Sequence, residues 1–190
     1  EHRTYQPRFK ADKTEIDRAV SMIAASKKPV FYCGGGVINA GPKASKSLRR
    51  LVKLTGAPIT QTLMGLGAYP GSDRQFLGML GMHGTYEANL AMHDADLIVA
   101  VGARFDDRIT GRLADFAPNS QKIHIDIDPS SINKNVAVDL PIVGDVGAVL
   151  DQMLRAWKAK NLKTNQKALK AWWAEIDEWR KKDCLKYKQA

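Results

Sequence analysis

The sequence predicts an α/β fold in which helices cover both faces of a doubly wound, mainly parallel sheet. Short apolar runs alternate along the chain with segments whose apolar residues recur at helical spacing. Most of the apolar runs lack the apolar–polar alternation of a half-exposed strand, which is typical of strands buried on both faces. Strands that alternate with helices in this way imply right-handed crossovers between parallel strands.

The first 60 residues contain two pairs of a helix followed by a strand. The spacing of apolar residues predicts a helix over residues 14–26, which Pro29 ends. Residues 30–33 are uniformly apolar and predict a buried strand, and the three glycines after them predict a sharp loop. Glycines on both sides bound a second helix over residues 42–55, and residues 57–60 form the next strand.

The middle of the chain is rich in loops, and regular elements return after it. Six glycines between residues 65 and 84 interrupt the chain too often for long helices or strands. Beyond them, the same two patterns predict helices over residues 85–93 and 146–157 and strands over residues 96–101, 122–128 and 140–144.

Five of the predicted strands are followed by glycine, a hydroxyl or a charge. Open parallel sheets bind ligands at the carboxyl ends of their strands, where such residues meet. The five segments are Gly34–Gly36, Gln61–Met64, Gly102–Arg108, Asp126–Asp128 and Gly144–Val146. Their coincidence predicts a binding site along one edge of the sheet.

The glycines after the first strand could let backbone N–H groups approach a pyrophosphate closely. They do not form the common dinucleotide motif, because its third glycine would fall at Asn39, and the lysine of a Walker motif is also absent. A tight turn that contacts no ligand explains the same three residues. Both interpretations stay open on the residues alone.

The charged residues at the other strand ends also have alternative interpretations. Asp126 and Asp128 point to one face of a strand. We expect Asp126 to accept hydrogen bonds from a ligand such as a ribose, and Asp128 to cap a short helix that begins at Pro129. The segment Arg104–Arg108 could hold an anionic substrate or diphosphate, or could form a surface ion-pair network.

Two apolar segments with glycines, Leu63–Gly67 and Met79–Gly84, are suited to packing a flat aromatic ring, although such segments more often cover a core. His83 could hydrogen-bond a ligand. The sequence contains no hydrolytic triad order, no HExxH motif and no paired glutamates. The residues therefore indicate binding rather than self-sufficient hydrolysis.

The 190-residue chain carries a net charge of +9, which by itself suggests a nucleic-acid partner. Most of this charge lies in residues 151–190, which hold 11 Lys and Arg, 5 Asp and Glu, and all four Trp. Apolar residues recur at helical spacing over residues 169–179, so this basic helix should pack against protein, either the body or the rest of a longer chain. No apolar run is long enough for a membrane span.

Five motifs taken together resemble one family closely. They are Gly34–Gly36, Thr62–Gly67, Leu80–Gly84, Gly102–Gly111 and His124–Asp128. The family is the catalytic large subunit of acetolactate synthase, also called acetohydroxyacid synthase, a thiamine-diphosphate enzyme. The similarity covers essentially the whole chain. Residues 104–108 discriminate best, because pyruvate oxidase and the oxoacid decarboxylases share the fold and the glycines but, as a rule, not that string.

Full-length members of this family have three domains, and the sequence resembles the central one, a Rossmann-like domain of the DHS-like NAD/FAD-binding type. The resemblance implies a linker from an N-terminal domain over residues 1–12, an FAD-binding α/β domain over residues 13–157, and a basic, Trp-rich helical linker towards a C-terminal domain over residues 158–190. The glutamate that activates thiamine and the magnesium motif belong to the other domains. We therefore expect this chain alone to be inactive.

The resemblance also implies which residues bind FAD. Gly34, Gly35 and Gly36 would lie near its ribityl and phosphate groups, Thr62, Leu63, Met64, Leu80, Gly81, Met82 and His83 along the flavin, and Gly102, Arg104, Asp126, Ile127, Asp145 and Val146 around the adenosine half. Met82, Asp107 and Arg108 would face the substrate channel, and Arg108 would pair with the carboxylate of the second 2-oxoacid. No metal site is implied within this domain.

The implied parent reaction condenses two pyruvates, or pyruvate and 2-oxobutanoate, to 2-acetolactate or 2-aceto-2-hydroxybutanoate with loss of CO2, in branched-chain amino-acid biosynthesis. Thiamine diphosphate and Mg²⁺ would be bound mostly by other domains. The implied partners are these substrates, further copies of the large subunit in a dimer or tetramer, and a regulatory small subunit, with neither nucleic acid nor membrane. The implied location is the bacterial cytoplasm, or the plastid in a plant.

Three other functions stay open. An NAD-binding domain of sirtuin-like type fits the sheet and the glycines but leaves residues 104–108 unexplained. The central domain of another thiamine-diphosphate enzyme, such as pyruvate oxidase or glyoxylate carboligase, fits the fold. A nucleic-acid-binding module is suggested only by the net charge and the basic tail.

Overall fold

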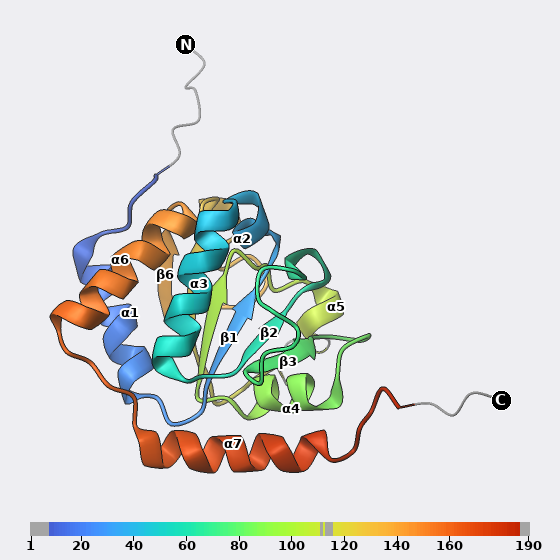
Figure 1. Ribbon diagram of the computed structural model, residues 1–190. Helices are drawn as coiled ribbons and strands as arrows, with labels where there is room; N and C mark the ends of the chain where they lie inside the picture. Colours follow the sequence, from blue (N-terminus) through green and yellow to red (C-terminus); the bar gives the residue numbers. More distant parts are fainter. Residues whose placement is uncertain (1–7, 111, 113–115, 187–190) are drawn as a thin grey trace.

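Six parallel strands form one sheet in the order β3-β2-β1-β4-β5-β6 within the part of the chain that is described. The computed structural model describes residues 8–110, 112 and 116–186, except for the side chains of Asp107 and Arg108 (Figure 1). The strands are β1 (Pro29–Cys33), β2 (Ile59–Gln61), β3 (Phe76–Met79), β4 (Leu97–Val101), β5 (Gln121–Asp126) and β6 (Leu140–Val143). The predicted α/β class is confirmed.

Helices cover both faces of the sheet. The helices are α1 (Lys13–Ala25), α2 (Gly35–Asn39), α3 (Pro42–Thr55), α4 (Tyr86–Asp94), α5 (Asp107–Thr110), α6 (Val146–Ala159) and α7 (Gln166–Arg180), with short 3-10 turns η1 (Leu63–Gly65) and η3 (Pro129–Ser131). Helices α1, α3 and α6 share a hydrophobic core with one face of the sheet, and α4 and α7 share a second core with the opposite face. The sheet is therefore doubly wound.

The two central strands are buried at every position, as their uniformly apolar sequences predict. They pair in parallel with Phe31 opposite Val99. Alternate residues of β1 enter opposite cores, so that Phe31 packs with α1, α3 and α6 while Tyr32 packs with the other layer. Both faces of β1 and β4 thus need apolar side chains.

Helix α3 begins and ends where its flanking glycines predict. Gly41 adopts a φ of +88° before Pro42, and Gly56 adopts the left-handed conformation at the carboxyl end, where its N–H donates to the Val52 carbonyl. Helix α1 starts after Asp12, whose N–H donates to the Glu15 carboxylate at 3.2 Å.

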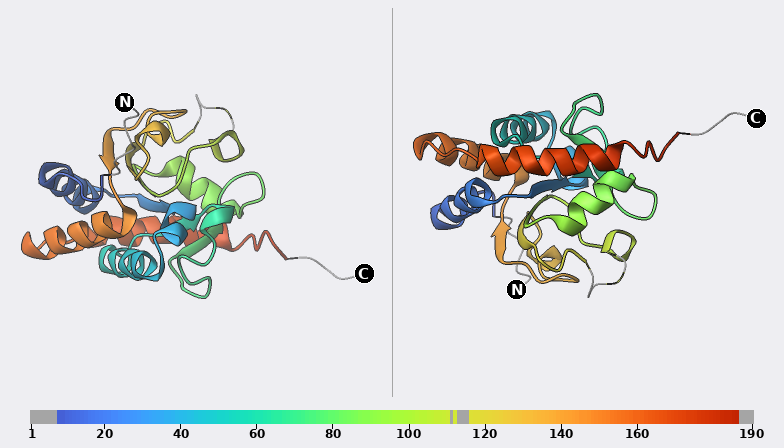
Figure 2. Two further views of the ribbon diagram at one scale, coloured as in Figure 1. Left: turned by 90° about the horizontal axis from the view of Figure 1, so that it is seen from above. Right: turned by 90° about the horizontal axis from the view of Figure 1, so that it is seen from below.

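Helix α7 packs on the body of this chain and crosses beneath the amino ends of the strands (Figures 1 and 2). The indole of Trp172 is completely buried and donates to the carbonyl of Pro29, where β1 begins. The indole of Trp173 donates to the Gly56 carbonyl, and Arg180 donates to the carbonyl of Phe76, where β3 begins. Of the two packing partners that the sequence left open, the body is the one observed.

Three elements were not expected from the sequence. Strand β3 lies inside the glycine-rich segment that was expected to be loops. Gly78 takes a φ of +97° within this strand and the pairing with β2 shifts in register, so the segment lacks a regular strand pattern. The glycines after β1 do not remain a loop but begin the short helix α2 at Gly35, and the short helix α5 follows β4. Helix α7 begins three residues before its predicted range, and the remaining strands and helices occur within about two residues of their predicted bounds.

Candidate functional site

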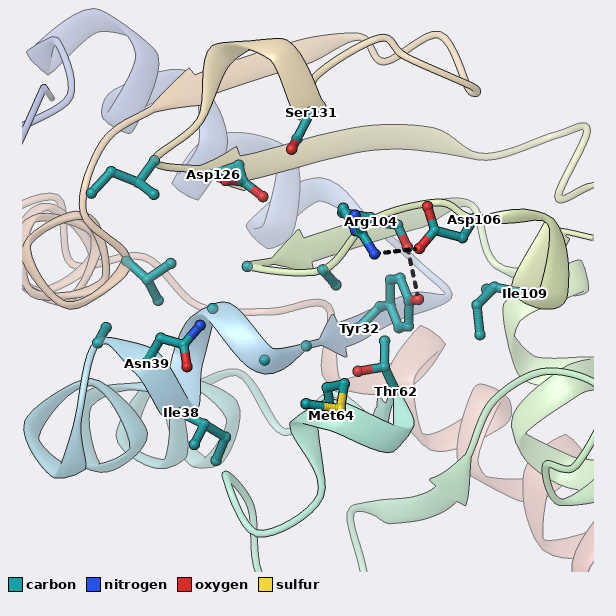
Figure 3. A pocket seen from close by; sticks show the side chains of 18 of the residues that line it. Tyr32, Ile38, Asn39, Thr62, Met64, Arg104, Asp106, Ile109, Asp126 and Ser131 are labelled. Carbon is teal, nitrogen blue, oxygen red and sulfur yellow. Dashed lines mark hydrogen bonds and ion pairs between the residues drawn. The ribbon is translucent and has the colours of Figure 1, made fainter. Parts of the chain in front are cut away.

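A large cavity opens at the carboxyl ends of the strands, over the junction between β1 and β4 (Figure 3). The chain leaves β1 towards β2 and later returns to β4 on the other side, so this junction is the topological switch point where open α/β sheets bind ligands. The cavity volume is about 1310 Å³, above the range of about 300–1,000 Å³ that is typical for drug-sized ligands. This volume can hold a ligand larger than a typical drug-sized molecule.

The cavity brings together residues from all five predicted strand ends. The lining includes Gly34, Gly35, Gly36, Thr62, Leu63, Met64, Gly102, Arg104, Asp126, Ile127, Asp145 and Val146. The predicted flavin contacts Leu80, Gly81, Met82 and His83 follow β3 and are not among the lining residues. Leu80 is buried in the core whereas the Met82 side chain is exposed, and their contact with a cofactor stays a prediction.

The predicted channel residues Asp107 and Arg108 form the start of α5, and their side chains lie outside the described part of the structure. Their neighbour Asp106 lines the cavity, and its carboxylate pairs with Arg104 at 3.0 Å. The segment after β4 therefore reaches the cavity with at least one ion pair, and the substrate roles of Asp107 and Arg108 stay predictions.

The glycines after β1 and β4 allow two backbone segments to touch. A Cβ atom on Gly34 would lie 2.5 Å from the Gly102 carbonyl oxygen, and one on Gly36 would lie 2.7 Å from the Gly102 Cα. The N–H of Gly36 donates to the Gly102 carbonyl at 2.9 Å. Close packing of the two loops thus requires these glycines whether or not a pyrophosphate binds there.

A buried tyrosine supports the charged segment after β4. Tyr32 lies on β1, lines the cavity and donates from its hydroxyl to the Arg104 carbonyl at 3.1 Å (Figure 3). Burial, followed by the nearby Asp106 carboxylate, raises the pKa of Tyr32 well above its ordinary range. The phenol therefore stays protonated and holds the backbone of residue 104 as a hydrogen-bond donor.

The two acidic residues at the carboxyl end of β5 lie in different surroundings. Asp128 caps the turn η3, where its carboxylate accepts from the Ser130 N–H at 2.9 Å. Hydrogen bonds from the side chain and the N–H of Ser130 lower the pKa of Asp128. Asp126 lines the cavity instead, and its Oδ1 accepts from the Asp128 N–H at 2.9 Å. The cap at Asp128 is confirmed, and Asp126 is placed where a ligand hydroxyl could donate to it.

Asp145 and Thr62 line the cavity, and each also caps the helix or turn that follows it. Asp145 is the N-cap of α6 and accepts from the Ala148 N–H at 2.9 Å, so the amino end of α6 points towards the cavity. Thr62 caps η1 by accepting from the Gly65 N–H at 3.0 Å. Helix amino ends and backbone N–H groups attract anionic ligand groups.

Apolar side chains stand exposed around the cavity. Ile38, Leu63, Met64 and Ile127 line it, and the exposed fractions of Leu63 and Met64 are 68% and 74%. Side chains of this size are seldom left so open unless something covers them. A ring system of a ligand, or a neighbouring part of a larger protein, would bury this surface.

The predicted segment Gly102–Arg108 also contributes Ala103 and Asp106 to the lining. The sequence did not single out several other residues of the lining, namely Tyr32, Ile38, Asn39, Ala40, Ile109, Thr110, Ser131, Lys134 and Asn135. Ser131, Lys134 and Asn135 come from the segment between β5 and β6. Asn135 donates to the Phe105 carbonyl at 2.9 Å, which holds that segment over the cavity. No local sequence signal marks a contact of this kind.

Within the described residues, no cluster of three or more His, Cys, Asp or Glu side chains is arranged to hold a metal ion. Among the same residues, no helix combines the length and apolar character that crossing a membrane requires. Cys33 lies buried beside Gln61, and burial raises the pKa of its thiol to about 12. The site therefore offers polar, charged and apolar contacts rather than a reactive thiol.

The sequence is similar to acetolactate synthases over nearly its whole length. It is 50% identical over 185 residues to the acetolactate synthase isozyme 3 large subunit of Escherichia coli (strain K12), covering 97% of this chain and 32% of that protein. It is 48% identical to the acetolactate synthase large subunit of Haemophilus influenzae, covering 98% and 32%, and 45% identical to an acetolactate synthase of Mycobacterium bovis, covering 96% and 29%.

The chain thus spans about one third of the length of these relatives. Residues 16–153, which include every strand of the sheet, match the family described as "Thiamine pyrophosphate enzyme, central domain". The doubly wound sheet with its cavity at the switch point agrees with this match. The chain belongs to the family of central domains of thiamine pyrophosphate enzymes, and it resembles those of acetolactate synthase large subunits.

Proposed function

We propose that this chain is the FAD-binding central domain of an acetolactate synthase catalytic subunit. The observation that carries the proposal is the cavity of about 1310 Å³, whose lining combines loop glycines, exposed apolar side chains and carboxylates from five strand ends. The volume of the cavity is large enough for a dinucleotide. The relatives named acetolactate synthase supply the reaction class.

The residues present fit the chemistry of FAD. The exposed apolar side chains of Leu63 and Met64 suit the flat flavin ring. Arg104 provides positive charge for the diphosphate. Asp126 provides an acceptor for ribose hydroxyls, as acidic residues at strand ends do in other nucleotide-binding sheets.

In the proposed parent enzyme, thiamine diphosphate with Mg²⁺ supplies the carbon–carbon bond chemistry that joins pyruvate to a second pyruvate or to 2-oxobutanoate. This domain contributes a scaffold for the substrate channel, with Met82, Asp107 and Arg108 facing it. Two relatives are named as large subunits, which supports the further proposal that the parent protein assembles with a small subunit. Regions outside residues 13–157 would connect this domain to its neighbours.

FAD titration tests the cofactor proposal directly. We expect the chain to quench flavin fluorescence on binding FAD, and NAD at equal concentration should not compete. Met64→Glu places a negative charge in the lining and should weaken FAD binding at least about tenfold. Leu66→Glu is the matched control, because Leu66 is exposed nearby but does not line the cavity. No saturable FAD binding, or displacement of FAD by NAD, would overturn the proposal.

Arg108→Lys tests the proposed channel role in a protein that joins this domain to the other two. Lysine cannot reproduce the bidentate pairing of arginine with a carboxylate. We therefore expect the KM for the second 2-oxoacid to rise about tenfold while the bound FAD content stays unchanged. Equal losses of FAD and of activity would instead show that Arg108 is structural.

A further inference from the structure

His124 is a completely buried imidazole directly beneath the cavity. It lies on β5 two residues before Asp126, so both side chains emerge on the same face of the strand, and Asp126 lines the cavity above it. The ring of Phe105 meets the imidazole edge-on, with 5.4 Å between the ring centroids. The imidazole is thus fixed between an aromatic ring and the carboxylate of the proposed ligand site.

Neither nitrogen of His124 has a hydrogen-bond partner with good geometry in the part of the chain that is described. A buried polar group without a partner loses its hydration and gains nothing in return. An apolar ring would fill the same place next to Phe105 without that loss. Without a ligand, the imidazole therefore lacks a well-formed hydrogen bond.

Two acceptors lie close to the ring. The Nε2 atom of His124 is 3.9 Å from Oδ2 of Asp126, and the backbone of Ala103, in the segment after β4, also favours a proton on the imidazole. Burial outweighs both and lowers the pKa of His124, so the ring is neutral near pH 7 and carries one N–H. Asp126 is already anchored through Oδ1 by the Asp128 N–H, which leaves Oδ2 for another donor.

We propose that His124 is a positioning residue for Asp126. When the hydroxyls of a ribose or similar diol occupy the cavity, Oδ2 of Asp126 closes on Nε2 of His124 by about 1 Å and accepts its N–H. The carboxylate is then held at both oxygens and presents its remaining lone pairs to the ligand hydroxyls. This inference rests on the proposed function, because it needs a hydroxyl-bearing ligand such as FAD at Asp126.

A double-mutant cycle on FAD affinity tests the coupling. We expect His124→Phe and Asp126→Ala each to weaken FAD binding about tenfold, and the double variant to bind no more weakly than Asp126→Ala alone. His124→Gln, which keeps an N–H donor, should recover part of the affinity that His124→Phe loses. Additive effects, or tight binding by His124→Phe, would overturn the inference.

Imidazole ¹⁵N NMR of the wild-type chain provides a signature that a purely structural histidine would not give. Addition of FAD should place the single proton of His124 on Nε2 and shift its resonance towards that of a strongly hydrogen-bonded N–H, and Asp126→Ala should abolish the change. The same His124 spectrum with and without bound FAD would overturn the inference alone. A wild-type chain that binds no FAD would overturn both the inference and the proposed function.

Discussion

At the scale of single residues, Gly102 joins the two loops that form the cavity floor. It adopts a φ of +54°, its N–H donates to the Ile125 carbonyl, and a Cβ atom would lie 2.7 Å from the Cα of Gly36. Both its backbone angle and its surroundings therefore exclude a side chain. By contrast, Gly41 has a φ of +88° but open space where its side chain would be.

This contrast predicts different outcomes for two substitutions. Gly102→Ala combines backbone strain with a backbone clash and should lower the free energy of unfolding by about 3–5 kcal/mol. Gly41→Ala adds only strain, about 1–3 kcal/mol, and should keep the affinity for FAD. Urea unfolding and FAD titration of both variants check this, and equal losses in the two would contradict it.

The pH dependence of stability reports on His124. Burial lowers its pKa from the ordinary value of 6.5, so below about pH 6.5 the unfolded chain binds a proton that the folded chain resists. The stability of the fold with a neutral His124 is therefore fully present above about pH 6.5 and is lost as the pH falls. His124→Gln should therefore show a shallower loss of unfolding free energy with acidification, measured by urea unfolding at a series of pH values.

His83 provides the control for that measurement, because its side chain is exposed whereas that of His124 is buried. His83→Gln should follow the wild-type pH dependence. If His124→Gln also follows it, the histidine beneath the cavity does not control acid stability.

At the scale of elements, α7 is held by its tryptophans rather than by its charges. The indole of Trp172 is completely buried and meets Trp179 edge-on at 5.6 Å, whereas the ion pair of Lys28 with Glu175 is partly exposed and contributes little. The basic residue Arg180 also helps to hold the helix against the sheet, since it donates to the Phe76 carbonyl. The apolar face fixes the helix beneath the sheet.

Trp172→Ala should lower the free energy of unfolding by about 3–5 kcal/mol, because it removes a large buried ring and the hydrogen bond to Pro29. Leu185→Ala is the control, since Leu185 lies beyond the helix and is exposed. Thermal unfolding followed by circular dichroism compares the two variants. A change of less than about 1 kcal/mol for Trp172→Ala would show that α7 is dispensable for the fold.

The strands that the sequence predicted and the strand that it missed are stabilised in different ways. Strands β1 and β4 are uniformly apolar because both faces are buried, so their residues alone identify them. Within the described part of the chain, strand β3 pairs with β2 alone at the sheet edge. It contains Gly78, so its pattern is not that of a strand. Its existence depends on tertiary pairing.

The residues of the candidate site also divide into those that local sequence patterns predict and those that they do not. Strand ends are local features, and the topology then brings five of them to one edge, which is why Gly34 and Asp126 could be predicted to lie at the same edge of the sheet. Lys134 and Asn135 reach the cavity through a long connection that is held by the Phe105 carbonyl. Side chains that arrive in this way leave no periodic or spacing signal in the sequence.

At the scale of the whole molecule, ligand binding should be visible as stability. FAD at 100 times its Kd should raise the free energy of unfolding by about 2.7 kcal/mol, and Tm by roughly 5–10 °C for a chain of this size. Riboflavin, which lacks the diphosphate and the adenosine, should raise Tm less at the same concentration. Equal shifts with both compounds would indicate that the adenosine half contributes no contacts.

The junction of β1 and β4 also has a consequence for the order of folding. Phe31 pairs with Val99, which lies 68 positions further along the chain, so this pairing closes one of the longer loops of the sheet. Contacts of such sequence separation form slowly, and the cavity above the junction cannot exist before them. If FAD binds as proposed, it should therefore leave the refolding rate unchanged and slow the unfolding rate, because the proposed site exists only in the chain in which the two halves have joined.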